Sequence, residues 1–169
     1  MATSSGQPWN SYSDLDPEAH RNMSMTIEKP ELRIDCKING KLCGVCCYKA
    51  VVPLTREDIK RIENLGFKAR EFIEFRLGVP ILRNIDGHCM FLDTATNTCK
   101  IYEMRPEACR LYPLIYSPKL WVHVDPWCPK AKDVPQEEVV RLASHVLRFY
   151  EKIKADWLSE NARDYSQDA

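Results

Sequence analysis

The most regular hydrophobic pattern of the chain lies near its C-terminal end. From Asp133, a possible helix cap, to about Tyr165, apolar residues recur at helical spacing and leave a polar opposite face. Such a stripe is more often core than cofactor contact, so we predict one long amphipathic helix that packs on its own domain. The stripe consists of Val139, Leu142, Val146, Phe149, Ile153 and Trp157.

Two shorter helices are predicted upstream. Thr55 and Asp58 have the spacing of a helix cap, although Glu or Gln is the usual partner, and Gly66 marks the end of this helix. A second helix is predicted over residues 69–77, with Gly78 as its end. Neither carries a plausible metal ligand, so both are expected to be packing elements. Their apolar residues are Ile59, Ile62 and Leu65 in the first and Phe72, Ile73 and Phe75 in the second.

Short strands and turns account for the rest of the pattern. Pro106 is expected to open a helical turn that places Cys109 near its positive end. Together with the long helix, these elements predict an α+β domain of short helices and hairpins. The expected strands are residues 32–34, a hairpin of 81–85 with 88–92 around Asp86-Gly87, and a hairpin of 114–116 with 120–124, with a further turn at Asn39-Gly40.

The length of 169 residues fits one ordinary domain with tails. Residues 1–30 are polar and aperiodic, and we expect a mobile arm there with Trp9 and Tyr12 as its docking groups. Residues 31–130 are expected to form the main domain, and residues 131–169 the helix that packs on it.

Charge and hydropathy exclude several classes of function. Lys and Arg total 24, as do Asp and Glu, so no field of one sign favours nucleic acid or an anionic membrane. No apolar run approaches the roughly 20 residues of a membrane span, and no secretory signal is recognisable. We therefore expect a cytoplasmic protein that binds neither nucleic acid nor membrane. The oligomeric state stays open.

The eight cysteines are the main chemical feature of the sequence. Thiols stay reduced in the cytoplasm, so eight of them indicate metal ligands rather than four disulfides. A hyperthermophilic source is the exception, because intracellular disulfides occur there. The sequence thus predicts a metal site at the centre of the domain. The candidate ligands are Cys36, Cys43, Cys46, Cys47, Cys89, Cys99, Cys109 and Cys128.

The spacing of these cysteines leaves their grouping open. Cys43 and Cys46 are separated by two residues and can bind one metal ion through a tight turn. The adjacent Cys47 can hardly serve the same ion, so one of Cys46 and Cys47 is expected to face a second metal, another iron of the same cluster or the core. Three arrangements are compatible with eight thiols: two four-cysteine sites, one such site plus structural cysteines, or a site that includes His88 or His123.

Several runs around these cysteines resemble the YkgJ-type cysteine-cluster family of zinc- or iron-chelating domains, known by the pattern CxxCxxCC. The resemblance implies a small α+β domain that binds a metal cluster, with iron–sulfur the favoured assignment. It spans residues 36–129, although Cys36 lies farther from Cys43 than the family spacing suggests. The runs that carry it are CGVCC at 43–47, CMFLD at 89–93, CKIYEMRP at 99–106 and CRLYP at 109–113.

The expected cofactor is one or two iron–sulfur clusters of the 4Fe-4S type, with zinc as the alternative. The Cys128-Pro129 pair matches the Cys-Pro ending of a ferredoxin run and favours iron–sulfur. Arg105 and Arg110 flank Cys109 and are expected to donate hydrogen bonds to cluster-bound sulfur. Alternatively, Arg105 caps the turn and Arg110 pairs with a nearby glutamate.

Electron transfer, or a role as a redox or accessory subunit with a protein partner, is the function that these features favour. A structural zinc module for protein interaction is the first alternative. A redox enzyme, with an open cluster iron or the vicinal Cys46-Cys47 pair, and an iron chaperone are further ones. No phosphate-binding loop, nucleotide fingerprint or nucleophile elbow is present. Whether the protein is an enzyme is therefore left undecided.

Overall fold

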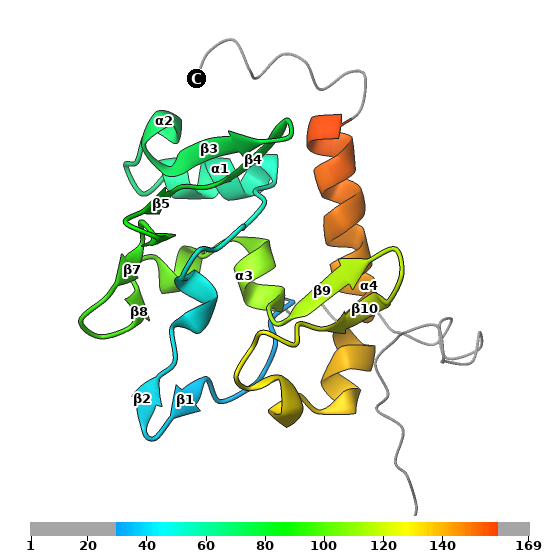
Figure 1. The fold of residues 1–169 in the computed structure, drawn as a ribbon. Coiled ribbons are helices and arrows are strands. Elements are labelled where there is room, and N and C mark those ends of the chain that lie inside the picture. The colour runs from blue at the N-terminus through cyan, green and yellow to red at the C-terminus, as the bar shows by residue number, and fades with distance from the viewer. Residues whose placement is uncertain (1–29, 159–169) are drawn as a thin grey trace, which may run out of the picture.

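The computed structural model describes residues 30–158, and Figure 1 labels its elements. Short helices and two-stranded antiparallel hairpins alternate along the chain, and one long helix follows them. The α+β class expected from the sequence is confirmed. The expected arm, apart from Pro30, and the end of the predicted C-terminal helix beyond Leu158 lie outside the described residues.

Each strand pairs with one other strand, and only isolated bridges add to these pairs, so no larger sheet forms within the described residues. The hairpins are β1 (Lys37–Ile38) with β2 (Lys41–Leu42), β3 (Ile73–Arg76) with β4 (Val79–Leu82), β5 (Asn84–Ile85) with β6 (His88–Cys89), β7 (Leu92–Asp93) with β8 (Thr98–Cys99), and β9 (Leu114–Ser117) with β10 (Trp121–Val124). The helices are α1 (Arg56–Glu63), α2 (Ala69–Phe72), α3 (Glu107–Leu111) and α4 (Gln136–Ile153). Shorter turns are the 3-10 turns Val45–Cys47, Tyr102–Met104 and Ala131–Asp133 and a π-helical turn Lys154–Leu158.

Helix α1 begins at the predicted cap. The Thr55 hydroxyl accepts the N–H of Asp58 at 3.1 Å, and the Asp58 carboxylate accepts the N–H of Thr55 at 3.0 Å. Aspartate therefore completes a capping box here in place of glutamate. Ile59 and Ile62 are buried as predicted, but Leu65 is exposed and does not belong to the apolar face.

The predicted helix over residues 69–77 is wrong beyond its first turn. Helix α2 ends at Phe72, and the chain continues as strand β3, which pairs with β4. Leu77 and Gly78 have φ values of 50° and 79°, the left-handed conformation of a tight hairpin turn. Pairing across this turn satisfies the backbone of Ile73–Arg76 and overrides its weak helical pattern.

Two strand predictions also need correction. Residues 32–34 form no strand, although the N–H of Leu32 donates to the carbonyl of Arg110 at 2.9 Å. The hairpin predicted over residues 81–92 is shorter, because β4 takes residues 81 and 82 and only β5 and β6 pair around Asp86-Gly87. The predicted hairpin at residues 114–124 is confirmed as β9 and β10.

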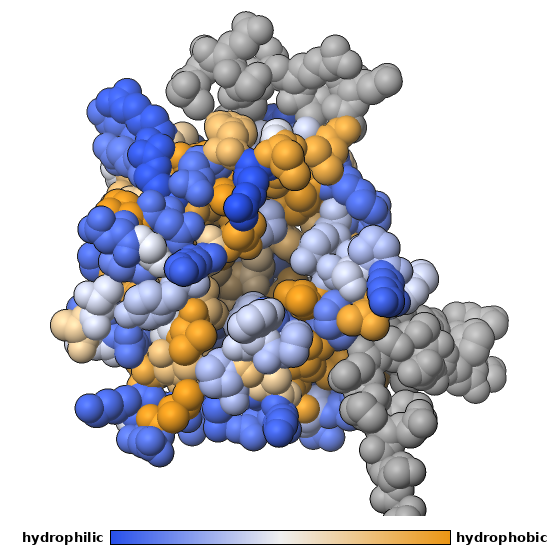
Figure 2. Space-filling model, viewed as in Figure 1, coloured by the Kyte–Doolittle hydropathy of each residue, from blue (hydrophilic) through white to orange (hydrophobic). Residues whose placement is uncertain are grey.

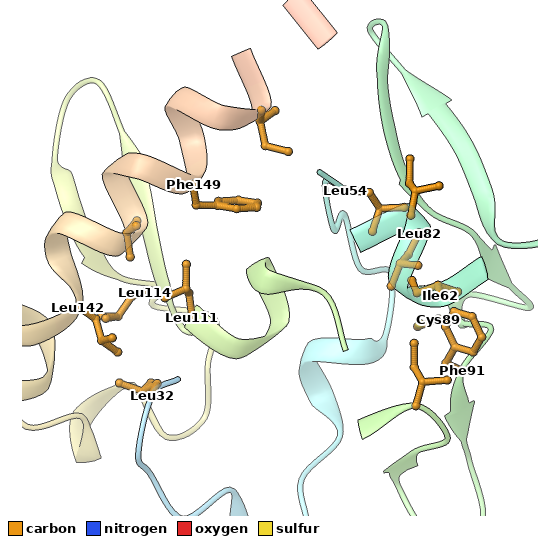
Figure 3. Close-up of a cluster of buried hydrophobic side chains, with 14 of the residues drawn as sticks. Leu32, Leu54, Ile62, Leu82, Cys89, Phe91, Leu111, Leu114, Leu142 and Phe149 are labelled. Carbon is orange, nitrogen blue, oxygen red and sulfur yellow. The ribbon is translucent and has the colours of Figure 1, made fainter. Parts of the chain in front are cut away.

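Helix α4 buries the predicted stripe as far as Ile153 against β9, β10 and α3, and Trp157 is buried in the π-helical turn that follows. Figure 3 shows Phe149 and Leu142 of this helix on one side of the core, and Leu54, Ile62 and Phe91 on the other. The Trp157 indole N–H donates to the carbonyl of Leu54 at 2.7 Å and joins the two sides. Within the described residues, no helix is both long and apolar enough to cross a membrane.

Candidate metal centre

The eight cysteines reach one region of the molecule from separate elements. All eight are free thiols, so no disulfide joins them. Cys36 precedes β1, Cys43 follows β2, Cys46 and Cys47 lie in the 3-10 turn, Cys89 ends β6, Cys99 ends β8, Cys109 lies in α3, and Cys128 follows β10.

The hairpin of β1 and β2 brings Cys36 and Cys43 together. Asn39 and Gly40 form the predicted turn, with φ values of 51° and 76°. At the end of the hairpin opposite this turn, the N–H of Cys43 donates to the carbonyl of Cys36 at 2.9 Å. The six-residue separation of these cysteines is thus the length of one short hairpin.

Four thiols, which we call the outer group, line one pocket. The pocket is completed by Gly44, Tyr112, Pro113, Pro129 and Lys130. Asp125 shapes the turn that supplies the last thiol, since its carboxylate accepts the N–H of Trp127 at 2.9 Å and its carbonyl that of Cys128 at 3.1 Å. The outer group consists of Cys36, Cys43, Cys46 and Cys128.

The other four thiols, which we call the inner group, lie at the hydrophobic core. Cys89 belongs to the core, and Cys47 and Cys99 pack against it. Burial raises the pKa of Cys109 well above its usual range, and the charges of Cys46, Cys89 and Cys99 raise it further, so these thiols are neighbours. The inner group consists of Cys47, Cys89, Cys99 and Cys109.

A single tight turn separates the two groups. Gly44 has a φ of 63°, and the N–H of Cys47 donates back to its carbonyl at 2.9 Å. The turn directs Cys46 to the pocket and Cys47 to the core. The Cys47 thiol donates a hydrogen bond to Cys46, which lowers the pKa of Cys46 to about 7 and raises the pKa of Cys47.

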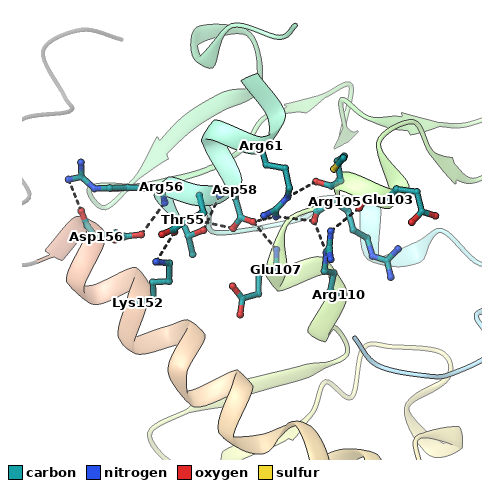
Figure 4. A network of polar contacts seen from close by, with 12 residues as sticks. Thr55, Arg56, Asp58, Arg61, Glu103, Arg105, Glu107, Arg110, Lys152 and Asp156 are labelled. Atoms are coloured by element: carbon teal, nitrogen blue, oxygen red, sulfur yellow. Dashed lines mark hydrogen bonds and ion pairs between the residues drawn. The ribbon is translucent and has the colours of Figure 1, made fainter. Parts of the chain in front are cut away.

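Helix α1 supports the start of α3 through a buried carboxylate (Figure 4). Asp58 is 1% exposed, pairs with Arg61, and accepts the N–H of Glu107 at 3.1 Å. This contact fixes the start of α3, so that Cys109 lies in its first turn as predicted. Helix α1 was predicted to serve packing alone, and this positioning role of Asp58 had no recognisable sequence pattern.

Main-chain N–H groups are already directed at several of the sulfurs. Cys89 accepts a hydrogen bond from the N–H of Phe91, and Cys99 from that of Ile101. Cys128 accepts the N–H of Lys130 in the same way. Each donor lies two residues after its cysteine, and each bond favours the thiolate, the form that binds a metal.

Five of the thiols disfavour ionisation in the absence of a metal cation. Burial is the largest cause that raises the pKa of Cys36, Cys89, Cys99, Cys109 and Cys128, and neighbouring thiols raise it further. A metal cation in their midst reverses this balance, because it attracts each thiolate and releases the proton.

Arg105 supplies one fixed positive charge near both groups. It lowers the pKa of Cys36 and Cys46 in the outer group and that of Cys99 in the inner group. Its guanidinium pairs with Glu31 and lies 3.8 Å from the ring centroid of Tyr102. Arg105 also donates to the carbonyl of Tyr102 at 3.2 Å, the turn-capping role expected as the alternative.

Arg110 donates hydrogen bonds to main-chain carbonyls around Arg105. It donates to the carbonyl of Arg105 at 3.1 Å and to that of Glu103 at 2.8 Å. These bonds hold the turn that carries Arg105. The hydrogen bonds expected from either arginine to cluster-bound sulfur stay a prediction.

Comparison with known proteins agrees with this arrangement. Residues 35–129 match the family described as "Putative zinc- or iron-chelating domain", CxxCxxCC. The chain belongs to this family. It is also 30% identical over 115 residues to "Uncharacterized protein MJ0661" of Methanocaldococcus jannaschii, and the match covers 60% of this chain and 62% of that protein. No solved structure matches.

The donor set suits the metals that the family description names. All eight candidate ligands are sulfur, which thiophilic zinc and iron–sulfur clusters prefer. Within residues 30–158, no three His, Cys, Asp or Glu side chains lie where they could together hold one ion. The thiols of this CxxCxxCC domain are thus gathered in two groups but are not closed around a single point.

The histidines make other contacts. The His88 ring contacts the carbonyl of Cys89 through Nδ1 at 3.0 Å and meets Tyr48 edge to face. Nδ1 of the buried His123 contacts the carbonyl of Trp121 at 2.9 Å. A site that includes either histidine stays a prediction.

Proposed function

We propose that this protein binds iron–sulfur through its cysteines and acts in electron transfer, as a carrier or as a redox or accessory subunit. The supporting observation is the arrangement of the donors: eight free thiols gather in one region, yet among residues 30–158 no three can hold one ion. Cysteines around a cluster bind different irons, so their sulfurs stand farther apart than around one zinc ion. Spread thiols therefore favour a cluster.

The chain offers groups that would adjust the charge of such a centre. A bound cluster supplies one-electron redox chemistry. The N–H groups of Phe91, Ile101 and Lys130 donate to sulfur, and Arg105 adds a positive charge. All four stabilise negative charge and favour the reduced state.

Access from solvent supports a role in electron transfer. Cys36 and Cys46 are exposed, and Trp127 beside Cys128 is 85% exposed. Three further exposed apolar residues adjoin the same thiols. We call these four residues the rim: Ile38, Leu42, Val45 and Trp127.

We propose that a protein partner docks on the rim. Figure 2 shows apolar side chains among hydrophilic ones over the hairpin of β1 and β2. Lys37, Lys41 and Lys132 are exposed on the segments that carry the rim. A small acidic redox protein matches this combination, because its carboxylates meet the lysines while apolar contacts bring the centres together.

Anaerobic purification with analysis of iron, sulfide and zinc tests the iron–sulfur proposal. We expect iron and acid-labile sulfide in equal amounts, with thiolate-to-iron charge-transfer absorption. Colourless protein that contains neither iron nor sulfide contradicts it.

Structural zinc is the second candidate, because the family description names zinc and four cysteines form its usual structural site. In that case the domain presents its surfaces to a partner without redox change. Stoichiometric zinc without sulfide in the anaerobic protein would favour this alternative.

A further inference from the structure

We propose that the chain holds two separate metal centres, one in the outer group and one in the inner group, joined by the peptide bond between Cys46 and Cys47. The inference deepens the proposed function and rests on its premise that the cysteines bind metal. It does not require that the metal be iron.

The number of thiols requires such a division if all of them are ligands. A single zinc ion takes four cysteines, and so does a four-iron cluster. Eight thiols exceed either by a factor of two. Four of the thiols line the pocket, and the other four lie toward the core. The structure therefore divides the eight thiols evenly.

Cys46 and Cys47 set the boundary between the centres. A single tetrahedral ion rarely takes two adjacent residues, and the turn after Gly44 directs the first to the pocket and the second to the core. Each group takes its other three thiols from different elements. Cys36, Cys43 and Cys128 come from the first hairpin and the turn after β10, whereas Cys89, Cys99 and Cys109 come from β6, β8 and α3.

The two centres differ in access. Cys36 and Cys46 of the outer group are exposed, although Cys128 of that group is buried. No thiol of the inner group is exposed, since Cys89 is buried in the core and the other three are half-buried. The outer centre therefore faces solvent and the rim, and the inner centre lies behind it. Such an order suits a relay in which electrons enter or leave through the outer centre. Four thiols for each centre also leave no iron open to substrate, which supports a carrier over an enzyme.

Serine substitutions of the neighbouring cysteines test the division most directly. We expect the wild-type protein, purified anaerobically, to contain two centres per chain by native mass spectrometry and elemental analysis. Cys46→Ser and Cys36→Ser should each lose the outer centre and keep half of the metal. Cys47→Ser and Cys99→Ser should each lose the inner centre and keep the other half.

Double variants show whether two cysteines serve the same centre or different centres. Cys36→Ser with Cys46→Ser should lose no more metal than either alone, because both thiols serve one centre. Cys36→Ser with Cys47→Ser should lose all of it. Equal losses in the two doubles, or one centre in the wild-type chain, overturn the inference.

The serine variants test the number of centres, whereas the identity of the bound metal tests the iron–sulfur proposal. The outer substitutions lie at exposed positions, so far-UV circular dichroism should show an unchanged fold even where inner variants unfold. Complete loss of metal from both Cys36→Ser and Cys46→Ser in a folded chain overturns the two-centre inference. Two zinc ions per chain would overturn the iron–sulfur proposal and support the two-centre inference. One four-iron cluster per chain would support the iron–sulfur proposal and overturn the two-centre inference.

Discussion

Gly44 and Asn97 lie so close that a side chain at Gly44 has no room. A Cβ built on Gly44 would stand 2.9 Å from the Cβ of Asn97. Asn97 lies in the loop between β7 and β8, and its amide donates to the carbonyl of Leu42 at 3.2 Å. The loop next to Cys99 is therefore fitted against the turn that carries Cys46 and Cys47.

Gly44→Ala should destabilise the protein and disturb the metal site. Alanine is strained at a φ of 63°, which costs about 1 kcal/mol, and the clash with Asn97 adds roughly 1–3 kcal/mol. Both groups should lose metal, because the turn directs a thiol to each. Urea unfolding and metal analysis of the anaerobic protein measure the two effects.

Gly40 provides the matched control for this substitution. It also has a positive φ, 76°, but nothing lies within 4 Å of the place that a Cβ would take. Gly40→Ala should therefore cost only the backbone strain, about 1 kcal/mol. Adding Asn97→Gly to Gly44→Ala should recover part of the lost stability. If the two alanine variants are equally unstable, the contact with Asn97 has no role.

The metal-free chain should react first at Cys46. Its pKa is lowered to about 7 by the hydrogen bond from Cys47, and its side chain is exposed, so it holds the most reactive thiolate near neutral pH. Iodoacetamide labelling of the reduced, metal-free protein, read by peptide mass spectrometry, should give a rate at Cys46 that rises with a midpoint near pH 7. The buried Cys89 should react later.

The same lowered pKa has a consequence for stability. The usual pKa of a thiol is higher, so the folded state binds the Cys46 proton less tightly than the unfolded state does. The contribution of Cys46 to stability is therefore lost as the pH falls through about 7. The raised pKa of Cys47 acts in the opposite direction above the usual thiol pKa, because the folded state then holds a proton that the unfolded state releases. Cys47→Ala removes the donor and should move the labelling midpoint upward, whereas an unchanged midpoint would contradict the hydrogen bond as the cause.

The sequence predicted the local elements that carry the cysteines better than the contacts that support these elements. Pro106 predicted the helical turn that carries Cys109, and Asp86-Gly87 predicted the hairpin that presents Cys89, because turn and cap residues act over a few positions. The contacts of Asp58 with Glu107 and of Gly44 with Asn97 span about fifty residues each and depend on the folded packing. The strand Ile73–Arg76 was missed because its partner across Leu77-Gly78 decides its conformation.

If the cysteines bind iron–sulfur, Arg105 should raise the redox potential of the bound centres, because it lies near both groups of thiols. Its positive charge stabilises the reduced state, so Arg105→Met should lower the potential by an amount on the order of tens of millivolts. Potentiometric titration followed by absorption measures the change. Arg105→Lys keeps the charge and should retain most of the potential. Arg76→Met, at the exposed end of β3, should leave it unchanged.

The exposed indole of Trp127 should matter to a partner and not to the fold. It is 85% exposed beside Cys128, so Trp127→Ala should change the free energy of unfolding by less than about 0.5 kcal/mol. Electron transfer from a small acidic flavoprotein to the Trp127→Ala variant, followed by stopped-flow absorption, should be severalfold slower than to the wild type. The double substitution Lys37→Glu with Lys41→Glu should slow electron transfer further and weaken the dependence of its rate on salt. Leu77→Ala is the matched control, because Leu77 is 95% exposed at the turn between β3 and β4, away from the rim. Equal rates for Trp127→Ala and Leu77→Ala would place the docking surface elsewhere.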